Sequence, residues 1–254
     1  MAKAKKHGTG AIVKRQGGTL AAAGEVDAMF GGGPVQIPVD APLPQISIMR
    51  ESAQFEMPDG QYAREFAGHI LFWHNANQYY TSEYGEGSSV VPDCASSDGI
   101  RPDGGEFVQA DSCRACGMNR FGSAPDGTAK ACQNTIRLYV LVDGEVIPCL
   151  LKAPPSSLGR KDSLMRWLTS APNIASRAGM GTKYQPIHVR FSLRKKDFAS
   201  GMSASVIELE TLRVLAMSED AAKLAALSAL YKELMESYMG RLCKDVATEK
   251  QGTE

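Results

Sequence analysis

Residues 94–132 read CASSDGIRPDGGEFVQADSCRACGMNRFGSAPDGTAKAC. This stretch holds four of the chain's six cysteines, spaced as Cys94-x18-Cys113-x2-Cys116-x15-Cys132. The residues between the cysteines are rich in turn-forming residues and poor in apolar side chains, so the segment needs a cross-link to become ordered. Four thiolates that include one Cys-x2-Cys knuckle match the tetrahedral, soft-ligand preference of zinc. We therefore expect a structural Zn²⁺ site made of all four: Cys94, Cys113, Cys116 and Cys132.

Two other interpretations of the cysteines stay open, namely two disulfides or unrelated buried thiols. The charged start of the chain, residues 1–6, is not followed by an apolar run, so no secretory signal is recognised and reduced thiols are expected. The signature of zinc deaminases is missing, because Ser112 rather than a proline precedes Cys113. Cys149 and Cys243 lie outside the cluster.

Length and charge bound the class of protein. The chain has 254 residues and is 43% hydrophobic, which is enough for one large domain or one domain with appendages. Basic and acidic residues both number 28, but they are segregated. Residues 44–112 carry three basic and eleven acidic side chains, whereas residues 160–196 carry nine basic ones and a single acid. One face built for an anion is predicted; the alternative is that these charges average out after folding.

Composition suggests three segments. Residues 1–43 are expected to be a flexible basic N-terminal arm, because they combine five basic side chains with glycine-rich runs and little apolar surface. Such an arm often touches nucleic acid, although a solvated tail would look the same. Residues 44–215 are expected to form the main β domain, with the zinc insertion at about 88–134. Residues 216–254 are expected to be a C-terminal helix and a short polar tail.

Strands are expected where polar and apolar residues alternate over short runs. These runs are 45–49, 67–74, 78–81, 135–142, 145–151, 184–193 and 203–209. Asn75–Asn77 is expected to turn the chain between the second and third runs, and Asp143-Gly144 between the fourth and fifth. The pattern therefore predicts antiparallel hairpins.

Two helices complete the expected elements. The first is predicted from Ser156 or Ser157 to a stop at Pro172, and the second from Ser218 to about residue 243. A single helix placed before the last hairpin is typical of an OB-fold. We therefore expect a mainly β (α+β) fold, an OB-like antiparallel barrel with a zinc-binding loop insertion and a C-terminal helix. Other mixed β barrels or sandwiches would give a similar pattern.

Enzyme signatures are scarce. No phosphate loop of the Gly-x4-Gly-Lys-Ser/Thr type occurs, and Gly31–Gly33 follows no expected strand. His69 and His74 are five residues apart on one expected strand, which should place them on opposite faces and disfavours a shared metal. The acids around the cysteines could bind a hard metal, but a solvated loop is the favoured interpretation. We expect a protein without enzymatic activity.

Binding signatures are stronger, because flat rings are interleaved with cations. Bases stack on rings for about 1–3 kcal/mol each while cations follow the phosphates of a single strand. Arg137 and Tyr139 share one strand face, as do Arg190 and Arg194. For each ring, a place in the core is the alternative. The expected nucleic-acid-binding residues are Trp73, Tyr79, Tyr80, Arg120, Phe121, Arg137, Tyr139, Arg190, Arg194, Lys195 and Lys196.

Several short motifs resemble a family of proteins carried by phages and related mobile elements. The motifs are Ile46-Ser47-Ile48, Gly68-His69-Ile70-Leu71, the turn from Pro92 to Gly99, the knuckle Cys113–Cys116, Phe121-Gly122-Ser123, Lys130-Ala131-Cys132 and Gly201-Met202-Ser203. The resemblance covers roughly residues 44–215. It implies a zinc-containing, OB-fold-like single-stranded DNA-binding protein of phage-type DNA replication or recombination. Proteins of that functional class often end in a run of acids, and the nearly balanced end of this chain departs from that pattern.

Function and partners are expected from this combination. The expected function is to bind single-stranded DNA in the cytoplasm of a bacterial host cell, together with replication or recombination proteins and without a membrane. The C-terminal helix could support self-association, although packing on its own barrel is ranked first. The alternatives are a zinc-stabilised adaptor or structural protein with a protein-binding surface, and a metal-dependent nucleic-acid enzyme.

Overall fold

The fold is taken from a computed structural model of the chain. The structure describes residues 43–49, 52–81, 92–103, 108–198, 203–216 and 218–249, with side chains up to residue 235. By contacts, the chain divides into Met1–Val35 and Gln36–Glu254, and every described residue belongs to the second unit. The predicted basic arm therefore lies outside the described residues, except for Leu43 at its end.

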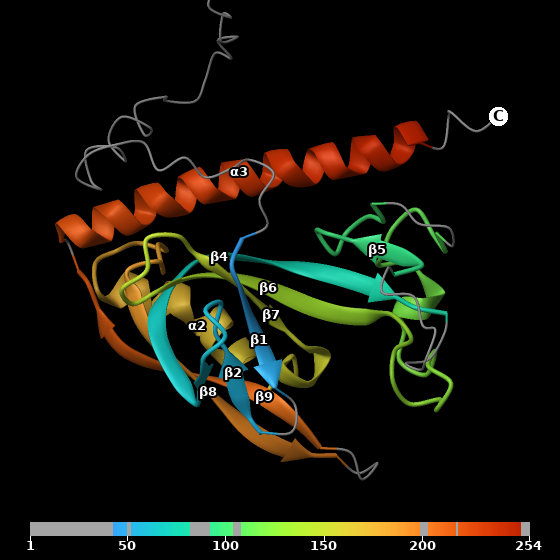
Figure 1. Ribbon diagram of the computed structural model, residues 1–254, viewed down its shortest axis with the longest axis horizontal. Coiled ribbons are helices and arrows are strands. Elements are labelled where there is room, and N and C mark those ends of the chain that lie inside the picture. The colour runs from blue at the N-terminus through green and yellow to red at the C-terminus, as the bar shows by residue number, and fades with distance from the viewer. Residues whose placement is uncertain are drawn as a thin grey trace, which may run out of the picture. The chain divides into compact units, whose positions relative to one another are not determined.

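One large sheet dominates the described chain (Figure 1). Its strands run in the order β3-β2-β1-β7-β6-β4-β8-β9, and β5 pairs with the end of β4. The elements are β1 (Gln45–Met49), β2 (Gln54–Glu56), β3 (Tyr62–Ala63), β4 (Glu65–Tyr79), β5 (Cys94–Ser96), the 3₁₀ turn η1 (Gly117–Asn119), β6 (Gln133–Val142), β7 (Cys149–Ala153), η2 (Pro155–Ser157), α2 (Ser163–Arg177), β8 (Ile187–Asp197), β9 (Ser203–Val214) and α3 (Glu219–Glu249).

The sheet is curled but open. Ser205 on β9 donates a hydrogen bond to the carbonyl of Met49 on β1 at 3.2 Å, although four strands lie between β1 and β9 in the order of the sheet. A mainly β fold with a C-terminal helix is therefore confirmed. The sheet is mixed rather than wholly antiparallel, because β1 and β7 pair in parallel through Ile46 and Leu151. The described strands form a half-barrel, and the OB topology is not established by this strand order.

The predicted turn at Asn75–Asn77 is wrong, because β4 runs unbroken through it for 15 residues. Pairing with β6 supplies the backbone partners, with Asn75 opposite Ile136 and Asn77 opposite Asn134. The side chain of Asn77 donates to the carbonyl of Gly99 at 3.3 Å and accepts from Asn134 at 2.6 Å. These long-range bonds override the local turn preference of asparagine.

A β-bulge in β4 changes which residues share a face. Ile70 lies opposite Val140 and Phe72 lies opposite Tyr139, so Leu71 is an extra residue on the β4 side. After the bulge the alternation is inverted. His69 pairs with Leu141 and His74 pairs with Arg137, two positions on the same face of β6. The expectation that His69 and His74 point to opposite faces is therefore wrong.

Three other boundaries differ from the predictions. The Asp143-Gly144 turn forms, with Gly144 at φ +86°, but β7 starts only at Cys149. Helix α2 begins after Asp162, and η2 takes up the predicted start at Ser156 or Ser157. Pro172 lies inside α2 rather than at its end. The missing amide of Pro172 is outweighed because the helix buries residues before and after it, among them Trp167 and Ala175.

Both faces of the sheet are covered by helices. On the inner face, α2 packs against a core in which the rings of Phe66 and Phe191 stack at 4.6 Å. On the other face, α3 packs through Leu224, Leu227 and Tyr231. The helix therefore packs on its own sheet, as the favoured interpretation predicted. Among the helices that the structure describes, none has the length and apolar stretch needed to cross a membrane.

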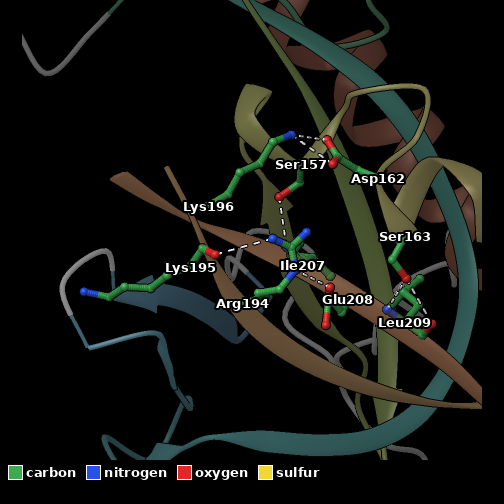
Figure 2. Close-up of polar contacts among 9 residues, drawn as sticks. All are labelled: Ser157, Asp162, Ser163, Arg194, Lys195, Lys196, Ile207, Glu208 and Leu209. Atoms are coloured by element: carbon green, nitrogen blue, oxygen red, sulfur yellow. Dashed lines mark hydrogen bonds and ion pairs between the residues drawn. The ribbon is translucent and has the colours of Figure 1, made fainter. Parts of the chain in front are cut away.

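Side chains cover the free edge of β9, which is an end strand of the sheet (Figure 2). The buried hydroxyl of Ser157 accepts the backbone N–H of Ile207 at 3.0 Å. Ser163 accepts the N–H of Leu209 at 2.9 Å and donates to the carbonyl of the same residue at 3.1 Å. Because unpaired strand edges promote association between chains, these serines both satisfy and shield the edge.

Ser157→Ala tests this edge. The substitution leaves the buried N–H of Ile207 without its acceptor, which should lower the free energy of unfolding by about 1–3 kcal/mol. The matched control is Ser176→Ala, at an exposed position of α2, which should change it little. Urea unfolding followed by circular dichroism measures both variants. Equal midpoints for the two variants would show that the serine hydroxyl does not hold the edge.

Candidate functional site

The four cysteines of the predicted zinc site line one small cavity of about 20 Å³ between β5, η1 and the start of β6. All four are free thiols, so the two-disulfide interpretation is not met. Pairing of Tyr79 with Cys94 fixes one side of the cavity to the end of β4. Cys132 immediately precedes β6. The neighbouring strands β4 and β6 thus anchor the cysteine segment at one end of the sheet (Figure 1).

Backbone bonds rather than apolar packing shape the segment. The N–H of Cys113 donates to the carbonyl of Ile100, and the carbonyl of Cys113 accepts from the side chain of Asn119 at 2.8 Å. Asp98 accepts the N–H groups of Ile100 and Arg101, which together with a bond from Ser96 lowers the pKa of its carboxyl against the effect of burial. The carboxylate of Asp98 therefore stabilises its own turn, which agrees with the interpretation of this segment as a solvated loop.

The thiols influence one another. Burial raises the pKa of Cys132 to about 11, and the three other cysteines of the quartet add to the rise. Burial is also the main cause that raises the pKa of Cys94. Crowded thiols with raised pKa values need a cation to become thiolates. The donor set therefore fits zinc in its chemistry.

The distances between the cysteine sulfurs are larger than a four-coordinate zinc site requires. Tetrahedral zinc with bonds of about 2.3 Å to sulfur places the sulfurs roughly 3.8 Å apart. Among the described residues, the set of three or more possible ligands whose donor atoms all lie within 4.8 Å of one another is His69, Asp143 and His188, which contains no cysteine. The sulfurs would have to approach one another to bind one ion.

The zinc prediction can be tested by metal analysis. Cys113→Ser should remove one equivalent of bound zinc relative to the unmodified chain and make the segment between β4 and β6 more sensitive to protease, because hydrogen bonds with little apolar packing would then have to hold the segment. Cys149→Ala is the matched control, since Cys149 is buried outside the quartet and should keep all the metal. Equal zinc content in the two variants would remove the quartet from consideration as a metal site.

The predicted basic strand is neutralised by acids from other strands. Arg190 contacts Glu210 at 3.1 Å and lies 3.8 Å from Glu65, and Arg194 contacts Glu208 at 2.6 Å. Lys196 contacts Asp162 at 2.9 Å (Figure 2). Lys195 is exposed and forms no ion pair with an acid among the described residues. Three of the nine basic side chains counted along residues 160–196 are thus paired with acids, and these three lie on the strand that was expected to bind an anion.

The basic strand and the cysteine segment also lie at opposite ends of β4. Arg190 is opposite Ala67, whereas Cys94 is opposite Tyr79. Twelve residues separate these positions, about 40 Å along an extended strand. The structure therefore does not bring Arg190, Arg194, Lys195 and Lys196 together with the cysteines in one groove.

The predicted stacking rings differ in how available they are. Tyr139 is only 3% exposed and stacks on Phe72 at 3.9 Å under α3, so its ring is not open to a base. Trp73 is half-buried and lines a cleft of about 510 Å³ together with residues of α3. Tyr79 and Tyr80 are half-buried near the cysteines. Phe121 is 82% exposed.

Phe121 is the ring best placed for a ligand. The ammonium group of Lys130 lies 5.2 Å from its centroid, and Lys130 is held there by bonds to Asn119 and Asn134. Arg120, the neighbour of Phe121 in sequence, is exposed. An exposed ring flanked by cations is what a stacked base with its phosphate requires.

Two cations and one histidine ring lie in a row across three neighbouring strands. His74 on β4 is opposite Arg137 on β6, and Arg137 is opposite Lys152 on β7. The amine of Lys152 donates to the side chain of Gln78, and the Nε2 atom of His74 lies 3.1 Å from the hydroxyl of Tyr139. Neither Arg137 nor Lys152 forms an ion pair with a carboxylate among the described residues. We call His74, Arg137 and Lys152 the cation row.

The pKa values of the cation row reflect this crowding. Partial burial lowers the pKa of Lys152, and the charge of Arg137 lowers it further. Burial is the largest cause that lowers the pKa of His74, and Arg137 again contributes. Arg137 also counteracts the rise that burial causes in the pKa of Tyr139. Like charges in direct cross-strand positions disfavour each other, so a bound anion would stabilise this arrangement.

Part of these groups could not be found from the sequence, for identifiable reasons. Lys152 was not singled out, because its position opposite Arg137 depends on the register of β6 with β7. His188 and Asp143 were not linked to His69, since they lie on three different elements. An alternation count that allowed for the extra residue Leu71 would have placed His69 and His74 on one face.

Comparisons with known proteins do not assign the chain to a family. No family model matches the chain, and neither curated proteins nor solved structures show a significant match. Function is therefore argued from the residues alone.

Proposed function

We propose that the protein binds single-stranded DNA without acting as an enzyme, and that the strand crosses the cation row beside the cysteine segment. The observation that carries the proposal is the cross-strand pair of Arg137 and Lys152, two cations without a carboxylate partner among the described residues. The pairs of the β8 arginines with Glu208 and Glu210 are the contrast, since there every arginine has its acid.

Electrostatics supports this location. Two like charges directly opposite each other in a sheet are destabilising, so the pair is unfavourable in the free protein. A phosphate between Arg137 and Lys152 would remove the repulsion and form two charge-assisted hydrogen bonds. Arg137 lies five residues from Cys132, about 17 Å along an extended strand, so a chain of nucleotides can reach from the row to the cysteine segment.

Stacking would take place at the cysteine segment. The exposed ring of Phe121 offers a platform, and Lys130 and Arg120 offer charge to the adjacent phosphate. Zinc in the cysteine quartet would give this segment a fixed shape, so that the ring is held in place before the strand binds. The predicted contacts of Arg190, Arg194 and Lys196 are less favoured, because these side chains already contact acids.

The finer assignments belong to the same proposal. A short helix, α2, precedes the β8–β9 hairpin, which supports a relation to the OB-like barrel but leaves the strand order different. The process we propose is phage-type DNA replication or recombination, carried out in a bacterial cytoplasm with other proteins of that process; it rests on the resemblance of the short motifs to those of phage and mobile-element proteins.

Fluorescence polarisation with labelled oligonucleotides tests the proposal. Single-stranded DNA should bind more tightly than duplex DNA, and the affinity should fall as salt is raised, because bound phosphates release counterions. Arg137→Gln and Lys152→Gln should each weaken binding and reduce the salt dependence. Phe121→Ala should weaken binding by about 1–3 kcal/mol, since one base loses its platform.

Arg194→Gln is the matched control, because Arg194 is an exposed arginine already paired with Glu208. It should bind DNA nearly as the unmodified chain does. Lys152→Gln should also raise thermal stability while it lowers affinity, because the repulsion with Arg137 disappears. If duplex and single strands bind equally, or if Arg194→Gln weakens binding as much as Lys152→Gln, the proposed interface is wrong. Single-stranded RNA is included to establish which nucleic acid is preferred.

A further inference from the structure

We propose that His69, His188 and Asp143 form a binding site for a divalent transition-metal ion, separate from the cysteine quartet and independent of the proposed DNA-binding function. One ring nitrogen of each histidine and one oxygen of Asp143 all lie within 4.8 Å of one another. Two imidazoles and one carboxylate with room for solvent are a common ligand set for zinc and for other divalent first-row metals.

The sheet itself brings the ligands together. His69 on β4 and His188 on β8 are directly paired across the ladder, and their rings stack at 5.0 Å. Asp143 follows β6, and its N–H donates to the carbonyl of Ala67 at 3.0 Å, which fixes the turn beside β4. Two ligands therefore come from directly paired strands, and the third comes from the turn after β6, which a backbone bond ties to β4. A site built on paired strands holds its geometry better than a site on free loops.

The histidine rings are oriented by further contacts. The Nδ1 atom of His69 lies 3.0 Å from the carbonyl of Gln185. When Nδ1 carries the proton and donates it there, Nε2 keeps the lone pair that a metal ion needs. The Nε2 atom of His188 lies 2.9 Å and 3.0 Å from the two oxygens of Asp143. A metal ion would replace the proton shared by this pair, with the carboxylate remaining as a ligand.

Exposure differs among the ligands in a way that suits an open site. Both histidines are 9% exposed, whereas the side chain of Asp143 is 55% exposed. Ligands bonded to zinc at about 2.0–2.2 Å lie roughly 3.4 Å apart, so small movements of the exposed carboxylate can complete the site. Solvent can then supply the remaining position. A salt bridge between His188 and Asp143 alone would account for two of the residues but not for His69.

The site is far enough from the quartet to be tested separately. His69 lies ten positions before Tyr79, the β4 partner of Cys94, and ten positions are about 33 Å along an extended strand. Zinc can therefore be counted at the two sites with independent variants. Loss of zinc from the cysteine variants bears on the quartet, and loss from Asp143→Asn bears on this site.

Equilibrium dialysis of the full chain against Zn²⁺ is the experiment. Asp143→Asn, at an exposed position that should leave folding intact, is expected to weaken one class of bound zinc by about 10-fold or more. Asp59→Asn is the matched control, an exposed acid in the turn before β3, and should leave zinc binding unchanged. Unchanged zinc binding in Asp143→Asn would overturn the proposal.

A second measurement does not depend on any variant. In nuclear magnetic resonance spectra of the histidine rings, added Zn²⁺ should shift the signals of His69 and His188 and leave those of His74 in place. His74 is the internal control, because its Nε2 atom contacts Tyr139 and no acid. Signals of His69 and His188 that do not move up to millimolar Zn²⁺ would show that the triad is only an ion pair with a neighbouring histidine.

Discussion

The ladder between β4 and β6 is the constraint on which the described structure depends. It runs from Gly68 opposite Val142 to Gln78 opposite Gln133. Each end of β4 has a further partner: β8 pairs with its first residues and β5 pairs with its last residues. The strands approach so closely at Gly68 that an added Cβ would lie 2.4 Å from the carbonyl oxygen of Leu141. Any larger residue there would separate the strands. The helices, the cysteine segment and both candidate sites are positioned by this one pairing.

Pairing of strands also decides which charges remain available. Cations on β8 face acids on β9, so Arg190 is compensated by Glu210 and carries little net field. Cations on β6 and β7 face each other, so the charges of Arg137 and Lys152 are not compensated by each other. A count of charge along the chain favours the first group and overlooks the second. Electrostatic arguments about this protein therefore depend on strand register rather than on sequence segments.

Local signals in the sequence were sufficient for much of the fold. Alternating residues located β1, β6, β8 and β9, and the serine before α3 caps the helix as expected, with Ser218 accepting the N–H of Ala221. Features that depend on distant partners could not be read in this way. The asparagines of β4 form a strand because β6 pairs with them, and the parallel pairing of β1 with β7 leaves no local mark. The same division holds for the candidate sites. The spacing of the cysteines was enough to predict that they converge on one cavity. Lys152 and the His69–Asp143–His188 triad could not be predicted, because their neighbours depend on strand register.

The extra residue at Leu71 sets the phase of the second half of β4. Because of it, the histidine triad and the cation row lie on the same side of the sheet, with the contacts of α3 to Leu71 and Phe72 between them. Deleting one residue at this point would exchange inward and outward positions for everything downstream, so that Asn77 would move to the other face of the sheet and His74 would enter the core. Substitutions leave this phase intact, whereas a change of length inverts it. In its evolution this strand can therefore accept new side chains far more readily than an insertion or deletion.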